Sequence, residues 1–276
     1  GFSRDKVRAE ASRPLNGYVF FGMPRSDSIS MPTIQKMIID PARAIGDVFI
    51  RYHFYDQSRV FSPTSGEDGF LSGSDYEPFL SYIGVMEDPA AFQESFDVGG
   101  ILSMGDAWGD GNISTLNLLK QLHSLANVTR QVLELLPDIV IFARPDLVYH
   151  STFLGPISRS VLLGAKSVAW LPSWQWSLGG FNDRFSICSG RAIAAYGLRA
   201  SLVGHYLRET GRPLHSELFL KYALDRSLCM VRTFKNTASR IRIDGRIVEE
   251  KFTPVSGSRL LKYWARESCK SIIANL

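Results

Sequence analysis

The chain has 276 residues, of which 45% are hydrophobic and 21% are charged, and its formal net charge is +4 at pH 7. This length and composition allow one large α/β domain or two small ones with a substantial core. The positive charges are spread along the chain, which suits an anionic small ligand or a lipid headgroup surface and does not argue for nucleic acid. No apolar run of about 18 residues is present, so we expect no membrane-spanning helix.

Strands and helices alternate in the first part of the chain. We predict strands at residues 18–21 and 47–51, and between them a helix at 33–39 that Pro32 starts. Leucines at helical spacing predict a longer helix at 114–136. We expect surface loops at 56–78 and 99–112, which are rich in small and polar residues.

A buried strand at 139–143 follows the long helix. The order strand, helix, strand, helix, strand favours an α/β fold with a mostly parallel sheet flanked by helices. Further on we predict a strand at 167–171 and helices at 190–208 and 216–228, then a hairpin around Asp244 and Gly245.

The three cysteines are widely spaced and form neither a CxxC pair nor a Cys/His metal pattern. We therefore expect free thiols, a reducing compartment and a cytoplasmic location. Residues 256–276 predict a basic amphipathic helix. Such a helix is usually a packed or solvated face, but this one would also suit peripheral contact with a membrane.

The segment 139–150 is the most informative part of the sequence. Its apolar run ends abruptly in Arg144, Pro145 and Asp146. The carboxyl end of a buried strand is where ligands bind in α/β sheets. Arginine can pair with phosphate through two hydrogen bonds, and aspartate can hold a hard metal or a sugar hydroxyl. This combination suggests a nucleotide diphosphate ligand, and the alternative is an internal ion pair that caps the strand.

A second candidate segment is the turn at 22–26, directly after the first strand. Gly22 would let the backbone approach a ligand, and Arg25 can reach phosphate. The turn resembles the phosphosulfate-binding loop of sulfotransferases, although Asp27 and Ser28 stand where those enzymes have Gly-Thr. The alternative is an ordinary turn with a surface arginine.

Two more segments lie in the second half. Trp174 and Trp176 offer flat apolar faces for a sugar ring, and Asn182 and Asp183 can accept hydrogen bonds from hydroxyls. The alternative there is a rigid loop in which the tryptophans are packed. Glu217, with His215 two residues before it, opens a helix and could act as a general base, although a carboxylate in a first helical turn is also a common structural feature.

Taken in order, these blocks resemble polysaccharide glycosyltransferases of the GT-A type. The matching segments run from about residue 18 to about residue 250 and are GMPRS (22–26), DVFI (47–50), NLLKQLHSL (117–125), ARPDL (143–147), GGFNDRFSICS (179–189), HSELFL (215–220) and RIRIDGRI (240–247).

The resemblance implies a GT-A, Rossmann-like fold in one domain at 1–255, with a nucleotide-binding half at 17–150 and an acceptor half at 151–255. It implies transfer of a sugar from a nucleotide-sugar donor to a glycan or lipid-linked saccharide acceptor. Two alternatives stay open: a sulfotransferase that uses a phosphosulfate donor, and a non-catalytic carbohydrate-binding protein.

The resemblance also assigns roles to individual residues. The ARPD segment corresponds to the family's metal-binding DxD motif, but Arg144 stands in place of the first aspartate, so Asp146 alone could hold Mn²⁺ or Mg²⁺. The expected site consists of a catalytic pair, Glu217 and Asp183; donor-binding residues Gly22, Arg25, Gln121, Arg144 and Asp146; and acceptor-binding residues Trp174, Trp176, Asn182 and His215.

Overall fold

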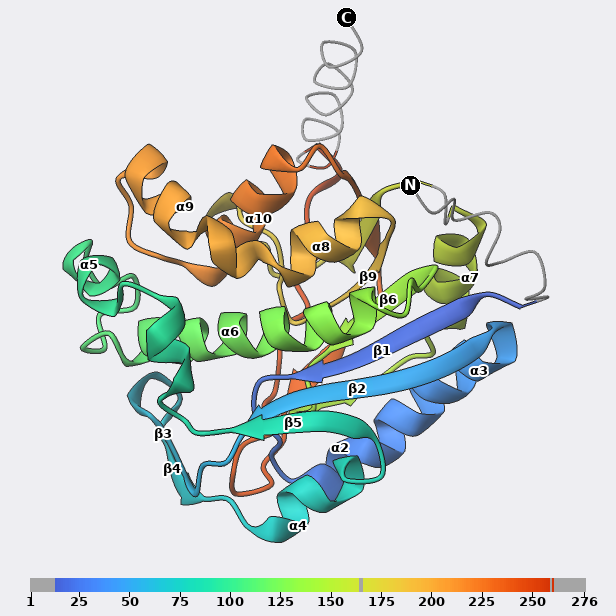
Figure 1. Ribbon diagram of the computed structural model, residues 1–276, viewed down its shortest axis with the longest axis horizontal. Coiled ribbons are helices and arrows are strands. Elements are labelled where there is room, and N and C mark those ends of the chain that lie inside the picture. Colours follow the sequence, from blue (N-terminus) through green and yellow to red (C-terminus); the bar gives the residue numbers. More distant parts are fainter. Residues whose placement is uncertain (1–12, 164–165, 259, 261–276) are drawn as a thin grey trace, which may run out of the picture.

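The computed structural model describes residues 13–163, 166–258 and 260. The strands of its main sheet are β1 (Leu15–Phe21), β2 (Asp47–Tyr55), β5 (Ile83–Glu87), β6 (Ile139–Ala143), β8 (Val168–Pro172), β9 (Phe185–Ser189) and β10 (Met230–Phe234). They lie in the order β10-β8-β9-β6-β1-β2-β5, and Figure 1 labels the run from β9 to β5. β9 runs antiparallel to both its neighbours, and the other adjacent pairs are parallel. The expected α/β fold with a mostly parallel sheet is confirmed.

Helices cover both faces of this sheet (Figure 1). They are α2 (Asp27–Ile34), α3 (Asp40–Ile45), α4 (Gly73–Tyr76), α5 (Val98–Ser103), α6 (Ile113–Leu133), α7 (Leu154–Leu162), α8 (Arg191–Gly197), α9 (Val203–Thr210) and α10 (Ser216–Arg226). Ile34 of α2 and Ile157 of α7 pack against one face, while Leu125 of α6 and Leu220 of α10 pack against the other.

The sheet's position follows from its apolar strands. β6 is buried along its whole length, as expected for a strand that is covered on both faces. Side chains along β1 alternate between the faces. Tyr18 and Phe20 therefore join one apolar cluster, and Val19 and Phe21 join the other.

The helix predicted at 33–39 is part of a longer helical segment. α2 begins at Asp27, a π-helical turn covers Gln35–Ile39, and α3 continues from it. Pro32 lies inside α2 and does not start it. A proline inside a helix lacks the amide that would bond four residues back, and the wider π-helical turn follows it closely.

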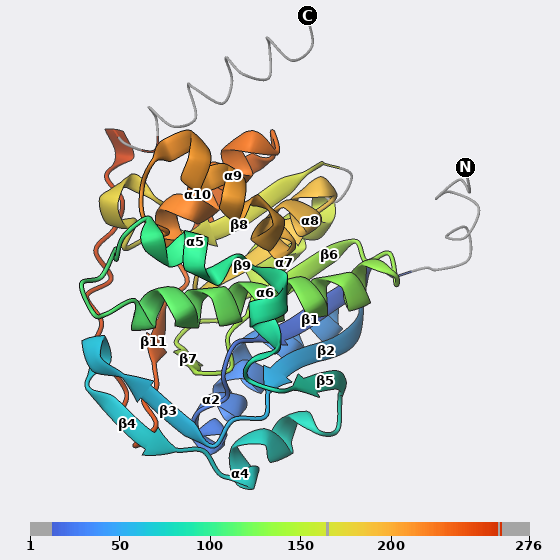
Figure 2. The same ribbon diagram turned by 60° about the vertical axis from the view of Figure 1, so that its left-hand side comes forward.

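The prediction of one surface loop at 56–78 was wrong. β3 (Arg59–Ser62) and β4 (Glu67–Phe70) form an antiparallel hairpin, and α4 follows it. A second short antiparallel pair, β7 (Leu147–Tyr149) and β11 (Ala238–Arg240), also lies outside the main sheet, and Figure 2 labels it together with the hairpin. A Cβ on Gly69 would lie 2.7 Å from the side chain of Ile243. The hairpin is therefore packed in place.

The predictions for the second half are partly confirmed. The strand at β8 and the helix at α10 are present, whereas β9, β10 and α7 were not predicted. The helix expected at 190–208 is divided into α8, a 3-10 turn at Arg199–Leu202, and α9. α5 occupies the start of the loop expected at 99–112.

The hairpin expected around Asp244 and Gly245 is a tight reversal of the chain. The amide of Arg242 donates to the carbonyl of Arg246 at 3.0 Å, and Gly245 has the positive φ of 79° that such a turn requires. The segments on either side of the turn pair through one antiparallel bridge, which joins Ile241 to Ile247.

The C-terminal helix expected at 256–276 falls almost wholly outside the described residues. In the part of the chain that the structure describes, no helix is long and apolar enough to cross a membrane.

Candidate functional site

A cleft of about 780 Å³ opens at the carboxyl ends of the parallel strands. Arg25 follows β1, Asp56 follows β2, and Arg144 follows β6. Because these strands run parallel, the segments after them meet at one edge of the sheet. Six residues expected at the site line this cleft: Gly22, Arg25, Gln121, Arg144, Asp183 and Glu217.

Arg144 and Asp146 form a bidentate ion pair at the inner wall of the cleft. Nε of Arg144 donates to Oδ1 of Asp146 at 2.9 Å, and Nη2 donates to Oδ2 at 2.6 Å. Asp146 is only 1% exposed. Burial alone would raise the pKa of its carboxyl, but Arg144, with Arg25 nearby, lowers that pKa below its ordinary value. Asp146 is therefore a buried anion that holds Arg144 in place.

Five arginines share three buried carboxylates around the cleft, and we call this group the arginine cluster. Its ion pairs are Glu67 with Arg25 (3.1 Å) and Arg242 (2.6 Å), Asp146 with Arg144 (2.6 Å) and Arg25 (3.8 Å), and Glu250 with Arg184 (3.2 Å) and Arg240 (2.7 Å). Five guanidinium groups against three carboxylates leave the cluster with a surplus of positive charge. All five arginines line the cleft, so an anion beside them would meet this surplus, reduced by the carboxylates of Asp56, Asp183 and Glu217 that line it too.

Three buried donor atoms of the site have no hydrogen-bond partner among the described residues. They are Nε of Arg25, Nη1 of Arg184 and Nε2 of Gln121. A buried donor without a partner costs free energy and is rare in folded proteins. All three side chains line the cleft. After small movements of these side chains, a ligand with several acceptor oxygens could therefore accept hydrogen bonds from the donors that the protein leaves unpaired.

Asp183 and Glu217 also line the cleft, from the second half of the chain. Burial, with the negative charge of Asp183 nearby, raises the pKa of Glu217 to about 7. The amide of Ser177 donates to Oε2 of Glu217. Asp183 is 9% exposed and its charge acts on Arg144. The two carboxylates thus offer one proton acceptor tuned to neutral pH and a second carboxylate at the cleft.

Gly180 lets the loop before Asp183 approach the first turn of α10. A Cβ at this position would lie 2.3 Å from the carbonyl carbon of Glu217 and 2.5 Å from its oxygen. The next amide, that of Phe181, donates to the same oxygen at 3.0 Å. The absence of a side chain at Gly180 therefore allows the contact that places Glu217 near Asp183.

The variant Gly180→Ala is expected to lower the free energy of unfolding by about 1–3 kcal/mol, because the backbone of Glu217 cannot move aside as a flexible side chain can. The loop should move outward, and the pKa of Glu217 should fall from about 7 toward the ordinary glutamate value. Urea unfolding and an NMR titration measure the two effects.

Gly197→Ala is the matched control for this variant. Its Cβ would lie 2.2 Å from Oγ1 of Thr129, between α8 and α6 and away from the cleft. This control should destabilise the protein but leave the pKa of Glu217 unchanged. If Gly180→Ala also left that pKa unchanged, the loop would not set the environment of Glu217.

Trp174 and Trp176 lie in the core, with exposed fractions of 2% and 6%, and not on the cleft surface. Nε1 of Trp174 donates to the carbonyl of Asn236, and Nε1 of Trp176 donates to that of Pro172, each at 2.8 Å. Asn182 is buried and donates to the carbonyl of Trp174 at 3.1 Å. The structure thus gives these side chains a role in holding the loop, and neither indole is placed to stack on a sugar in the cleft.

His215 is half-buried beside the cleft, where its ring stacks on Trp108 with 5.2 Å between the ring centroids. Burial lowers the pKa of His215 below its ordinary value. Trp108 lines the cleft and provides an aromatic surface there, which was not predicted from the sequence.

The turn at 22–26 differs from an anion-binding loop. The amide of Ser26 donates to the carboxylate of Asp75 at 3.0 Å. Asp27, the first residue of α2, is buried, and burial together with Asp75 raises its pKa to about 8. Because Asp75 occupies this amide and brings its own carboxylate, the turn offers an anion one backbone donor fewer, which argues against the phosphosulfate interpretation.

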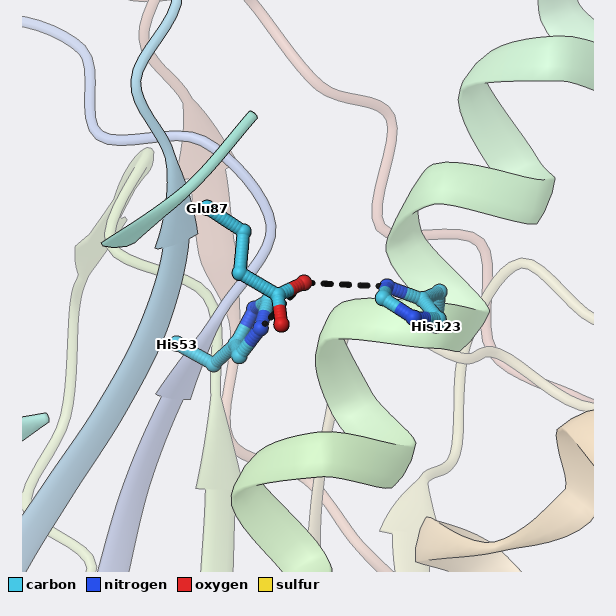
Figure 3. A group of neighbouring side chains, drawn as sticks. All are labelled: His53, Glu87 and His123. Atoms are coloured by element: carbon cyan, nitrogen blue, oxygen red, sulfur yellow. Dashed lines mark ion pairs between the residues drawn. The ribbon is translucent and has the colours of Figure 1, made fainter. Parts of the chain in front are cut away.

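The surroundings of Asp146 do not suit a divalent cation. Both of its oxygens accept hydrogen bonds from Arg144, and Arg25 lies 3.8 Å away, so a cation would meet two guanidinium charges. In the described part of the chain, a different group could hold a metal ion: His53, Glu87 and His123 (Figure 3). Their ligand atoms all lie within 4.8 Å of one another.

No protein-family model matches the chain, and no curated protein matches it. Among solved structures, apo mouse xyloside xylosyltransferase 1 aligns with 80% of this chain and 84% of its own, at 11% identity and a TM-score of 0.41. A protein assigned as a glucose-1-phosphate thymidylyltransferase from Bacillus anthracis, in complex with sucrose, aligns with 82% of this chain and 89% of its own, at 8% identity and a TM-score of 0.37. Both TM-scores are low, so the function has to be argued from the cleft itself.

Proposed function

We propose that the chain is a glycosyltransferase that moves a sugar from a nucleotide-sugar donor to a saccharide acceptor. The observation that carries this proposal is that the arginine cluster and the pair Asp183 and Glu217 line one cleft. A nucleotide sugar carries a negative charge on each of its phosphates, which the surplus charge of the cluster would balance. More charge develops on the diphosphate as it leaves, so fixed cations beside it lower the barrier to transfer.

The donor side of the site would be built from the first half of the chain. Arg25 and Arg144 would bind the diphosphate, and Gln121 would supply the donor atom that is now unpaired. Gly22 has a φ of 92°, which favours glycine and keeps the turn after β1 open to a ligand. Asp146 would orient Arg144 and would not touch the donor.

The acceptor side would be built around Glu217. A carboxylate with a pKa of about 7 can accept the proton of an attacking hydroxyl group at neutral pH. Asp183 would accept hydrogen bonds from sugar hydroxyls, and Trp108 stacked on His215 would offer an apolar face to the sugar ring. With Glu217 as the base, the hydroxyl oxygen would attack the anomeric carbon directly as the nucleoside diphosphate leaves, and this direct displacement inverts the anomeric centre.

A thermal-shift screen of nucleoside diphosphates tests the donor site. A nucleoside diphosphate at about a hundred times its Kd should raise the melting temperature by roughly 5–10 °C, and the shift should persist in EDTA because Asp146 is not a metal ligand. Arg144→Met should abolish the shift. Arg226→Met, which removes an exposed arginine paired with Glu209 on the protein surface, is the matched control and should keep it.

The same screen separates the alternatives. Adenosine phosphosulfate should give no larger shift than adenosine diphosphate. If it alone stabilised the protein, the sulfotransferase reading would replace this proposal. If saccharides stabilised the protein but no nucleotide did, the chain would be a carbohydrate-binding protein.

A further inference from the structure

A second site lies under the floor of the cleft and involves none of the residues of the arginine cluster. His53 is on β2, Glu87 is the last residue of β5, and His123 is on the face of α6 that packs against the sheet. Figure 3 shows the carboxylate of Glu87 between the two imidazole rings. Three elements far apart in the sequence therefore direct imidazole and carboxylate groups toward one point.

The spacing of these groups matches the spacing of ligands around one metal ion. Oε2 of Glu87 lies 3.1 Å from Nε2 of His53 and 3.7 Å from Nδ1 of His123. Two ligands bound tetrahedrally to Zn²⁺, each at about 2.0–2.1 Å, lie roughly 3.3 Å apart. Closing the remaining distance, between the two histidines, needs only a small movement of the His123 side chain, since all three ligand atoms already lie within 4.8 Å.

Asn127 and Tyr55 also contact the two rings. Nδ2 of Asn127 lies 3.2 Å from Nε2 of His53 and 3.4 and 3.3 Å from the two ring nitrogens of His123, so this donor would turn aside when a metal takes these nitrogens. The hydroxyl of Tyr55 lies 2.7 Å from Nδ1 of His123. The same nitrogen lies 3.7 Å from Oε2 of Glu87, so it would leave Tyr55 to bind the metal.

The position of the His53 ring also fits a ligand. Its Nε2 lies 3.1 Å from Oε2 of Glu87 and so faces the centre of the group. Among the described residues, its other nitrogen, Nδ1, is buried without a hydrogen-bond partner.

We propose that His53, Glu87 and His123 bind one Zn²⁺ ion, or a similar divalent transition metal, and that this ion clamps α6 to β2 and β5. Two imidazoles and one carboxylate suit Zn²⁺, whereas Mg²⁺ and Mn²⁺ prefer oxygen ligands. Three protein ligands leave a fourth position for water. The inference does not rest on the proposed function.

The clamp would also support the floor of the cleft. Oγ of Ser124, beside His123, donates to the carbonyl of His53 at 2.6 Å and accepts from the amide of Gly22 at 3.1 Å. Lys120 and Gln121, one turn earlier on α6, line the cleft. A metal bound to His123 would therefore hold the segment of α6 that faces a ligand.

The test uses the full chain, stripped with EDTA and then given Zn²⁺ or Mg²⁺ alone. We expect about one Zn²⁺ per chain by elemental analysis and, at about a hundredfold excess over Kd, a rise in melting temperature of roughly 5–10 °C. Mg²⁺ should give no rise. Co²⁺ should show the visible absorption bands of a tetrahedral site. An equal rise with Mg²⁺ would overturn the assignment to a transition metal.

Two substitutions locate the ion. Glu87→Gln keeps the size and hydrogen bonding of a half-buried side chain, and it should weaken Zn²⁺ binding by at least about 10–100-fold. His123→Gln should do the same, while His205→Gln, which changes an exposed histidine on α9, should bind as the wild type does. The proposal is overturned if the wild type takes up no Zn²⁺, or if Glu87→Gln and His123→Gln bind it as tightly as His205→Gln.

Discussion

The variant Glu217→Gln should lower kcat for sugar transfer by about 10²–10⁴-fold, the usual contribution of a general base. The amide has almost the shape of the carboxylic acid but cannot take the proton from an attacking hydroxyl group. Donor affinity should stay within about twofold of the wild type, because Glu217 faces the acceptor. Initial rates with a labelled nucleotide sugar, together with a donor titration, measure both quantities once an accepted donor is known.

The pH dependence of kcat tests the role of Glu217 more directly. A base must be deprotonated to act, so kcat of the wild type should rise with pH and level off above about 7, where the Glu217 carboxyl titrates. The residual activity of Glu217→Gln should lack this inflection. A wild-type inflection near the ordinary glutamate pKa, or the same profile in the variant, would assign the base to another residue, with Asp183 the first candidate.

Stability measurements exclude unfolding as the cause of the lost activity. Because the folded state raises the pKa of Glu217 above its unfolded value, the folded protein binds the proton more tightly than the unfolded chain does. The contribution of Glu217 to stability is therefore present at low pH and is lost as the pH rises through about 7. Glu217→Gln should match the wild type in urea unfolding at pH 4, below the unfolded pKa, and be more stable than the wild type at pH 8.

The cleft residues that directly follow strands could be predicted from the sequence, because the pattern that identifies a strand and its end is local. The apolar run before Arg144 predicts a buried strand, and a buried strand of a parallel sheet directs the residue after it to the ligand-binding edge. Gly22 and Arg25 follow β1 in the same way. These residues could be placed in the cleft without knowledge of their partners.

The partner of Arg25 was missed because it is distant in the sequence. Glu67 pairs with Arg25, 42 positions away, and with Arg242, 175 positions away. Nothing in the neighbourhood of Glu67 distinguishes it from a surface carboxylate, since it lies in a segment that resembles a loop. Its hairpin is held by a contact between Gly69 and Ile243 that no local pattern contains.

Trp174 and Trp176 were assigned to a sugar-binding surface, but the packed alternative describes them better. They stand beside glycines and polar residues, which favoured the sugar-binding interpretation, whereas both rings are buried and their N–H groups bond to backbone carbonyls. An indole has one polar atom, so a single carbonyl is enough to make its burial favourable. Whether such a carbonyl lies within reach depends on the fold, so the burial of these rings could not be predicted from the local sequence.

Asp146→Asn is expected to lower the free energy of unfolding by about 3–5 kcal/mol, the usual cost of removing one partner from a buried ion pair. Arg144 would lose the charge that its two hydrogen bonds neutralise, and Arg25, 3.8 Å away, would add repulsion. Urea unfolding measures the loss. Asp225→Asn is the matched control: it removes the partner of Lys221 one turn away on α10 and should cost less than about 1 kcal/mol.

The double variant Arg144→Met/Asp146→Leu separates stability from donor binding. Replacing both charges by apolar side chains leaves no buried ion unpaired, so most of the stability lost in Asp146→Asn should return. Nucleoside diphosphate binding should not return, because the guanidinium group that faces the cleft is gone. If Asp146→Ala or the double variant bound the nucleotide and transferred sugar as the wild type does, this ion pair would lie outside the donor site, and the segment after β6 would only cap a strand.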